Sequence, residues 1–196
     1  MFGNLFRLRS KPVKQFLVAR LNARIMPLDR GDLFEDPLDV ALKAADLGEI
    51  SGGGTQQAES GEIEYCDLEI ECPSLTDELV SLVVSTLEAL GAPKGSILHV
   101  ESQDRELPFG RLEGLAVYLN GTDLHDDIYR DSDSNFVRDE FERLLGTEGR
   151  VLGWWQGPTE TALYMYGASF SSMRERLTTF ISTYPLCERC RIVQIA

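Results

Sequence analysis

The sequence predicts an α+β fold in which one unit occurs twice. Residues 16–101 and residues 111–196 each show the order strand, helix, strand, strand, helix, strand. In both halves a glycine-containing segment leads into a strand of alternating apolar and polar residues, over 62–72 and over 160–167. A repeated βαββαβ order predicts two ferredoxin-like units in tandem, each with a mostly antiparallel sheet and with its helices on one face.

The first half begins with residues 16–26, which alternate between apolar and polar side chains as a strand does. Pro27 is expected to end this strand, and a polar loop over 29–32 to follow it. Asp36 and Pro37 then predict the start of the first helix, because aspartate caps helices and proline suits the first helical position.

The remainder of the first half has three further features. The glycine-rich residues 51–55 indicate a bulge, or a point where another part of the chain, such as the second half, approaches closely. After the strand over 62–72, apolar spacing predicts a helix over 75–90, and residues 97–101 form the closing strand.

The second half repeats this order. Alternation predicts a strand over 115–119, and apolar spacing predicts a helix beginning near Asn135. A hairpin is expected around Gly157, followed by a helix over 171–183 and a last strand over 191–195.

Four segments are therefore expected: a basic N-terminal arm over 1–15, the first half over 16–101, a linker over 102–110 and the second half over 111–196. The arm lacks the continuous apolar stretch of a secretory signal, and no apolar run approaches the ~18 residues of a membrane span. We read the start as mature sequence of a protein without a membrane span.

The cysteines favour a reducing compartment, and hence the cytoplasm. Cys66 and Cys72 lie on one face of the same strand, too far apart to bridge each other. Cys187 and Cys190 form a single C-x-x-C that follows a helix instead of opening one, so they are interpreted as incidental thiols.

The net charge of −13 is unevenly distributed. Residues 1–30 contain seven basic residues and one acidic residue, whereas residues 31–80 contain one lysine and fourteen acidic residues. Phosphate backbones require cationic surfaces, so the acidic excess argues against nucleic acid as the main partner. It fits a basic protein partner, or a role in solubility alone.

Strand parity predicts which side chains lie on the sheet face that the helices leave open. In the first half this face would carry Arg20, Asn22 and Arg24 next to an acidic strand. The acidic neighbours are Asp67, Glu69 and Glu71. Such pairs form either a solvated ion-pair ladder or a polar recognition surface.

The open face of the second half would be aromatic. Its members are Tyr118, Asn120, Tyr164 and Tyr166, with Trp154 or Trp155 from the neighbouring strand. Clustered tyrosine and tryptophan are typical of contact surfaces. The alternatives are a surface for a ligand or partner, the junction between the two halves, or a core layer.

No motif predicts a cofactor, a metal site or a catalytic centre. Residues 51–55 lack the Gly-Lys-Ser/Thr ending of a phosphate-binding loop. Residues 131–142 have the oxygen spacing of a calcium loop, but Phe136 stands where that loop needs glycine. A helix capped by Asp133 or Ser134 is expected there instead.

These observations favour a non-enzymatic binding protein over an enzyme. One concrete version is an acidic inhibitor or immunity-type protein that acts on a basic protein partner. The alternative is a small-ligand binder or enzyme that uses a cleft between the halves, with Arg20, Arg24, Tyr164 and Trp155 as first candidates. Self-association into a homo-oligomer is a third hypothesis.

Overall fold

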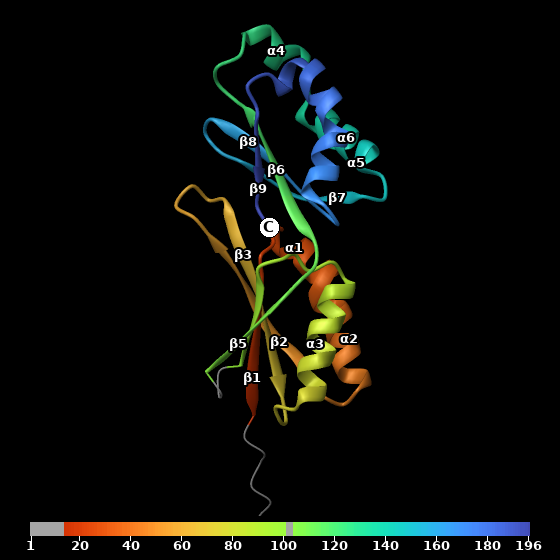
Figure 1. The fold of residues 1–196 in the computed structure, drawn as a ribbon. Helices are drawn as coiled ribbons and strands as arrows, with labels where there is room; N and C mark the ends of the chain where they lie inside the picture. The colour runs from red at the N-terminus through yellow and green to blue at the C-terminus, as the bar shows by residue number, and fades with distance from the viewer. Residues whose placement is uncertain (1–13, 101–103) are drawn as a thin grey trace, which may run out of the picture.

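The computed structural model describes residues 14–100 and 104–196, which form two halves stacked end to end (Figure 1). The strands of the first half are β1 (Gln15–Leu21), β2 (Glu49–Gln57), β3 (Ile63–Cys72), β4 (Ser96–Val100) and β5 (Arg105–Phe109). Its helical segments are α1 (Pro27–Arg30), the π-helical turn η1 (Gly31–Glu35), α2 (Asp36–Ala44) and α3 (Asp77–Ala89).

The second half contains the strands β6 (Glu113–Asn120), β7 (Gly149–Gln156), β8 (Glu160–Gly167) and β9 (Arg191–Gln194). Its helical segments are α4 (Asp126–Asp131), α5 (Ser134–Leu145), α6 (Phe170–Thr183) and the 3₁₀ turn η3 (Pro185–Cys187).

The strand orders confirm the duplicated fold. The first sheet has the order β2-β3-β1-β4-β5 and the second has β7-β8-β6-β9. The paired strands within each sheet are antiparallel. Counted within its own half, each sheet places the second, third, first and fourth strands side by side. The molecule therefore consists of two ferredoxin-like units.

The first helical segment begins earlier than the sequence predicts. Helix α1 starts at Pro27, and α1, η1 and α2 follow one another without a break, so the loop expected over 29–32 is helical. Phe34, Leu38 and Leu42 are fully buried along this segment. Pro37 lies inside it as the second residue of α2. The π-helical turn just before α2 is the kind of irregularity expected near a proline, which cannot donate a backbone hydrogen bond.

Two other boundaries differ. Strand β1 ends at Leu21, and residues 22–26 continue as a segment without strand pairing instead of extending the strand to residue 26. Strand β5 lies inside the segment expected to link the halves, and it pairs with β4 as a fifth strand of the first sheet. The expected basic arm lies outside the described residues up to residue 13.

The helix expected near Asn135 is present as α5, and Asp133 caps it. The Asp133 carboxylate accepts a hydrogen bond from the Asn135 amide at 2.8 Å. A capped helix thus occupies the segment with calcium-loop spacing.

Each half has its own helix-covered core, but one of these cores extends into the other half. The core of the second half packs β6 and β8 against α5 and α6. The core of the first half continues onto the opposite face of the second sheet. Within residues 14–100 and 104–196, no helix combines the length and the apolar character that crossing a bilayer requires.

Candidate functional site

The tyrosines predicted on one face of the second sheet do share that face, and they are buried against the first half. Tyr118 is 6% exposed, Tyr164 is 0% and Tyr166 is 1% exposed. The rings of Tyr118 and Tyr164 meet edge to face with their centroids 6.5 Å apart. Of the three interpretations of this aromatic face, the described structure corresponds to the junction between the halves.

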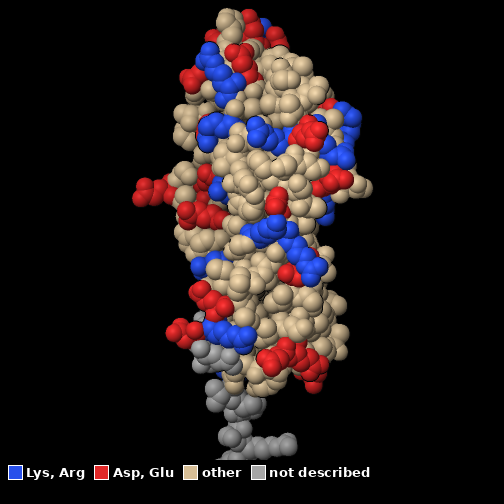
Figure 2. All heavy atoms as spheres, viewed as in Figure 1, with Lys and Arg blue, Asp and Glu red and all other residues tan. Residues whose placement is uncertain are grey.

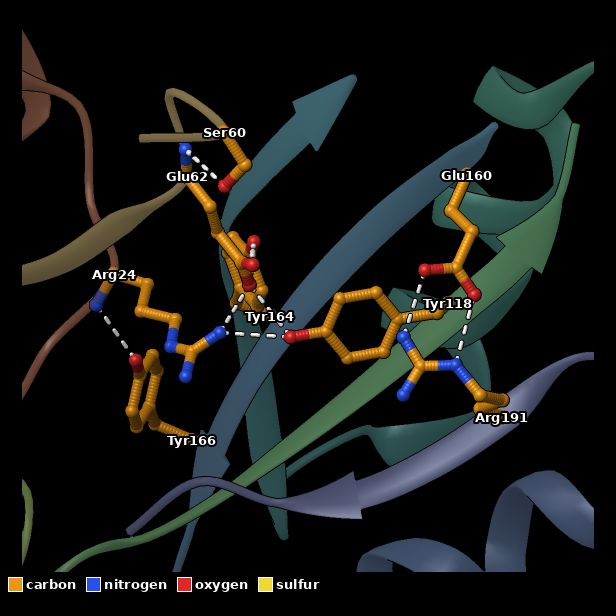
Figure 3. Close-up of polar contacts among 8 residues, drawn as sticks. All are labelled: Arg24, Ser60, Glu62, Tyr118, Glu160, Tyr164, Tyr166 and Arg191. Carbon is orange, nitrogen blue, oxygen red and sulfur yellow. Dashed lines mark hydrogen bonds and ion pairs between the residues drawn. The ribbon is translucent and has the colours of Figure 1, made fainter. Parts of the chain in front are cut away.

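The carboxylate of Glu62, from the first half, is the centre of this junction (Figure 3). Its Oε1 atom accepts hydrogen bonds from the hydroxyls of Tyr118 at 2.6 Å and Tyr164 at 2.8 Å. The guanidinium of Arg24 also pairs with Glu62 and donates to the Tyr118 hydroxyl at 2.8 Å. The Tyr166 hydroxyl accepts a hydrogen bond from the Arg24 backbone amide at 2.7 Å.

The electrostatics of this cluster keep its tyrosines protonated. Burial raises the pKa of Tyr164, and its hydrogen bond to the Glu62 carboxylate raises that pKa further. Burial also raises the pKa of Tyr166. A neutral phenol that donates to a carboxylate holds two segments together, whereas general-base or nucleophilic chemistry would require the phenolate.

A second ion pair flanks the cluster within the second half. Arg191 binds Glu160 through two hydrogen bonds of 2.7 and 2.8 Å, and its guanidinium lies 4.3 Å from the centre of the Tyr118 ring. Figure 3 shows Arg191 and Glu160 on the far side of Tyr118 from Glu62. The Tyr118 ring therefore lies between the two ion pairs.

The backbones of the two halves approach closely beside this cluster. A side chain on Gly153, at the bulge of β7, would overlap the carbonyl oxygen of Arg24. The side chain of Asn22 donates to the carbonyls of Lys94 at 2.8 Å and Ile195 at 3.3 Å, and thereby joins both halves. Asn22 and Arg24 thus lie at the junction and not on the open face of the first sheet, because β1 ends before them.

The remaining predicted site residues lie elsewhere. Asn120 accepts hydrogen bonds from the amides of Thr122 and Asp123 and from the Tyr129 hydroxyl, so it holds the turn after β6. Trp155 packs against the core that the halves share, whereas Trp154 is 47% exposed.

Arg20 lies on the open face of the first sheet, as predicted. It binds Asp67 through two hydrogen bonds of 3.0 and 3.2 Å, and its guanidinium lies 4.0 Å from the centre of the Tyr65 ring. The register of β1 and β3 pairs Arg20 with Asp67, Val18 with Glu69, and Phe16 with Glu71.

This open face carries carboxylates on three strands, β2, β3 and β5. Glu49 of β2 pairs in register with Glu71 of β3, and Glu106 of β5 pairs with His99 of β4. Its carboxylates are Glu49, Asp67, Glu69, Glu71 and Glu106. Lys14 binds Glu71, and His99 lies 3.2 Å from Glu106. The Glu69 carboxylate forms no ion pair within the described part of the chain.

The acidic face also contains a shallow hollow of about 400 Å³. Its lining includes Arg20, Asp67, Glu69 and His99. Acidic and basic side chains are interspersed over the side of the molecule drawn in Figure 2, so the charge excess does not cover every surface uniformly. The five carboxylates and this hollow make the open face of the first sheet a candidate site.

A separate hollow of about 320 Å³ lies between the halves. Asp29 and Asp32 line it from the first half, and Arg138, Arg150 and Trp154 line it from the second. None of the four residues expected in a cleft, Arg20, Arg24, Tyr164 and Trp155, lines this hollow.

The thiols do not form a reactive site. All four cysteines are free, and burial raises the pKa of Cys187 to about 12. A high pKa keeps the thiol protonated and lowers its nucleophilicity. Within residues 14–100 and 104–196, no group of three or more histidine, cysteine, aspartate or glutamate side chains could hold a metal ion.

Comparison with known proteins gives only weak structural similarity. No protein-family model and no curated protein matches the chain. A solved structure of the first two RRM domains of the yeast poly(U)-binding protein is 12% identical, with a TM-score of 0.26, and the match covers 92% of this chain and 99% of that chain.

Two putative monooxygenases are similar at the same level. The one from Fusobacterium nucleatum is 9% identical with a TM-score of 0.31, and covers 94% of this chain and 92% of its own. The one from Lactobacillus acidophilus is 13% identical with a TM-score of 0.29, and covers 93% and 94%. These likenesses are too weak to carry a functional argument, so function must be argued from the described side chains.

Proposed function

We propose that this protein binds a basic protein partner through the open face of its first sheet, as an acidic inhibitor or immunity-type protein. The observation that carries the proposal is the set of five carboxylates on a sheet face that bears no helix, with Glu69 unpaired within the described residues. An uncompensated carboxylate on a sheet favours cationic side chains of a partner and speeds their encounter.

The junction supports this proposal indirectly. Tyr118, Tyr164, Tyr166 and Arg24 hold the second half against the first, so they act by fixing the molecule and not by touching the partner. The free cysteines fit a reducing compartment such as the cytoplasm.

The test compares two charge reversals that change the net charge equally. Glu69→Lys places a cation on the acidic face, and Glu175→Lys places one on an exposed position of α6. We expect the wild-type chain and Glu175→Lys to capture the same basic protein from an extract of the source cells at low salt. Glu69→Lys should fail to capture it.

The salt dependence and the affinity complete this test. Capture should be lost at about 1 M salt, where the screening length falls to about 3 Å. The captured protein should then bind the purified chain in isothermal titration calorimetry. Equal binding by Glu69→Lys and by Glu175→Lys would contradict the proposal.

A second candidate function rests on the hollow between the halves. One wall carries two aspartates, and the other carries two arginines and the exposed Trp154. This arrangement suits a small zwitterionic ligand, because each charge would face its opposite. Thermal stabilisation by free amino acids that disappears in Trp154→Ala would support it, and no stabilisation by any of them would remove it.

A further inference from the structure

The first sheet ends in β2, whose edge is protected at its start, where the Ile50 amide donates to the Asp39 carboxylate of α2 at 2.9 Å, but has little protection from residue 51 onward. Strand β2 has nine residues and lies at the end of the strand order. Residues 51–57 contain no charged residue and no proline, the two kinds of residue that commonly block strand pairing at an edge. The opposite edge of the same sheet, β5, contains Arg105, Glu106 and Pro108.

Two glycines of β2 leave the acidic face accessible from this edge. Gly52 pairs in register with Glu69, and Gly54 pairs with Asp67. A Cβ atom on Gly52 would lie 3.0 Å from Oε2 of Glu69, so the Glu69 carboxylate lies over Gly52 near the margin of the sheet. Around a Cβ atom on Gly54 there is nothing within 4 Å.

The third glycine, Gly53, faces the helix-covered side of the sheet, and side chains already fill the space next to it. A Cβ atom on Gly53 would lie 2.5 Å from Oε1 of Glu35 and 3.3 Å from the guanidinium of Arg30. Arg30 binds Glu35 at 2.7 Å and donates to the Gly54 carbonyl at 2.8 Å and to the Thr55 hydroxyl at 2.7 Å. These bonds fix β2 from the helix side, which lowers the ordering cost of pairing a further strand with it.

An added strand would lie about 4.8 Å beyond β2 and would direct alternate side chains to the acidic face. Long lysine or arginine side chains at those positions would meet no side chain on Gly52 or Gly54. They would reach the carboxylates of Glu69 and Asp67 across the two glycines. The glycines therefore combine an open backbone edge with access to negative charge.

We propose that β2 binds an extended segment of the basic partner by strand addition, with lysine or arginine at every second residue contacting Glu69 and Asp67. The inference rests on the proposed function, because it specifies how the basic partner is recognised. Main-chain pairing would supply affinity, and the alternating cations would supply selectivity.

The experiment uses the full chain and synthetic peptides as probes. One peptide alternates lysine and threonine over the length of β2, and a second has the same composition with its lysines grouped in a block. A third carries the alternating sequence with N-methyl groups on every second amide, and a fourth carries them on the other amides. Binding is measured by isothermal titration calorimetry at low salt.

We expect the alternating peptide to bind more tightly than the block peptide. One of the two N-methylated peptides should lose binding, because its blocked amides face β2, while the other should retain it. Gly54→Lys should weaken binding about fivefold by opposing the cations of the peptide, whereas Gly54→Glu should not weaken it. The two variants place side chains of similar length in the same open space, so they share any effect on the backbone.

Several outcomes would overturn the inference. Equal binding of all four peptides, with a loss on Glu69→Lys but not on Gly54→Lys, would leave the acidic face as the partner site and remove strand addition. Absence of binding by any peptide, together with failure of the charge-reversal test, would remove the proposed function as well. Self-association that Gly54→Lys abolishes, without peptide binding, would assign the edge to a second copy of the chain.

Discussion

The two sheets have the same strand order, but the open face of the first is accessible to solvent whereas that of the second is buried. The face of the first sheet bears carboxylates and half-buried residues such as Val18 and Tyr65, while the face of the second sheet is buried beneath the first half. The difference comes from the side chains, since aromatic rings gain free energy by leaving water whereas carboxylates lose it. A duplicated fold can thus bury one open face to hold its two units together and leave the other face exposed.

The largest expected effect tests the buried face. Tyr164→Ala removes a fully buried ring and two contacts to the first half, and should lower the free energy of unfolding by about 3–5 kcal/mol. Tyr65→Ala, on the open face of the first sheet, should cost about 1 kcal/mol or less. Urea denaturation measures both, and equal losses would mean that the two faces are equally buried.

The next effect concerns the charge at the centre of the junction. Glu62→Gln removes the carboxylate that balances Arg24 and accepts from two tyrosines, and should destabilise the protein by about 2 kcal/mol. Glu64→Gln is the control, because Glu64 is exposed two residues further along, in β3, and its effect should lie within about 0.5 kcal/mol. Similar losses for the two variants in thermal denaturation would argue against a role for Glu62 in holding the halves together.

The buried tyrosines also predict an alkaline pH dependence. The pKa of Tyr164 is raised in the folded state above its ordinary value of 10.0, so above that pH the unfolded chain releases the proton first. Stability contributed by this group is complete below about pH 10 and should fall by about 1.4 kcal/mol per pH unit above it. Urea denaturation of the wild type and of Tyr164→Phe across this range measures the difference.

Tyr164→Phe should reduce the alkaline slope of the wild type. If it leaves the slope unchanged, the ionisation of Tyr164 does not contribute to stability.

The smallest effect belongs to the open face. Arg20→Gln breaks the ion pair with Asp67 where both side chains are partly exposed, and should change the free energy of unfolding by less than about 1 kcal/mol. This small loss should shrink further in high salt, as measured by urea denaturation. A loss as large as that of Glu62→Gln would show that the first open face also stabilises the fold.

Much of the architecture was predictable because alternation and helical spacing are local signals. The βαββαβ order, the parity of the strands and the shared face of Tyr118, Tyr164 and Tyr166 all follow from them. The sequence did not predict that α1 starts at Pro27, because residues 29–32 are polar. This segment is helical because Phe34, which follows it in the same continuous helical segment, is buried in the core.

The site was less predictable, since its contacts join distant parts of the chain. Glu62 lies 102 residues from Tyr164 in sequence and 56 from Tyr118, and no local pattern connects them. Arg30 and Glu35 were also missed as supports of β2. The glycines of β2 did carry a signal, because they indicated a bulge or a close approach of another part of the chain. The structure shows the bulge after Ile50, and the approaching group is the Arg30–Glu35 pair, not the second half.

The core that crosses the junction has a consequence for how this molecule unfolds. Separating the halves would expose three tyrosines and leave Glu62 without its donors, so neither unit would keep its native stability alone. Cooperativity should therefore span the whole described chain, and a single melting transition is the natural behaviour of two gene-duplicated units that have become thermodynamically inseparable.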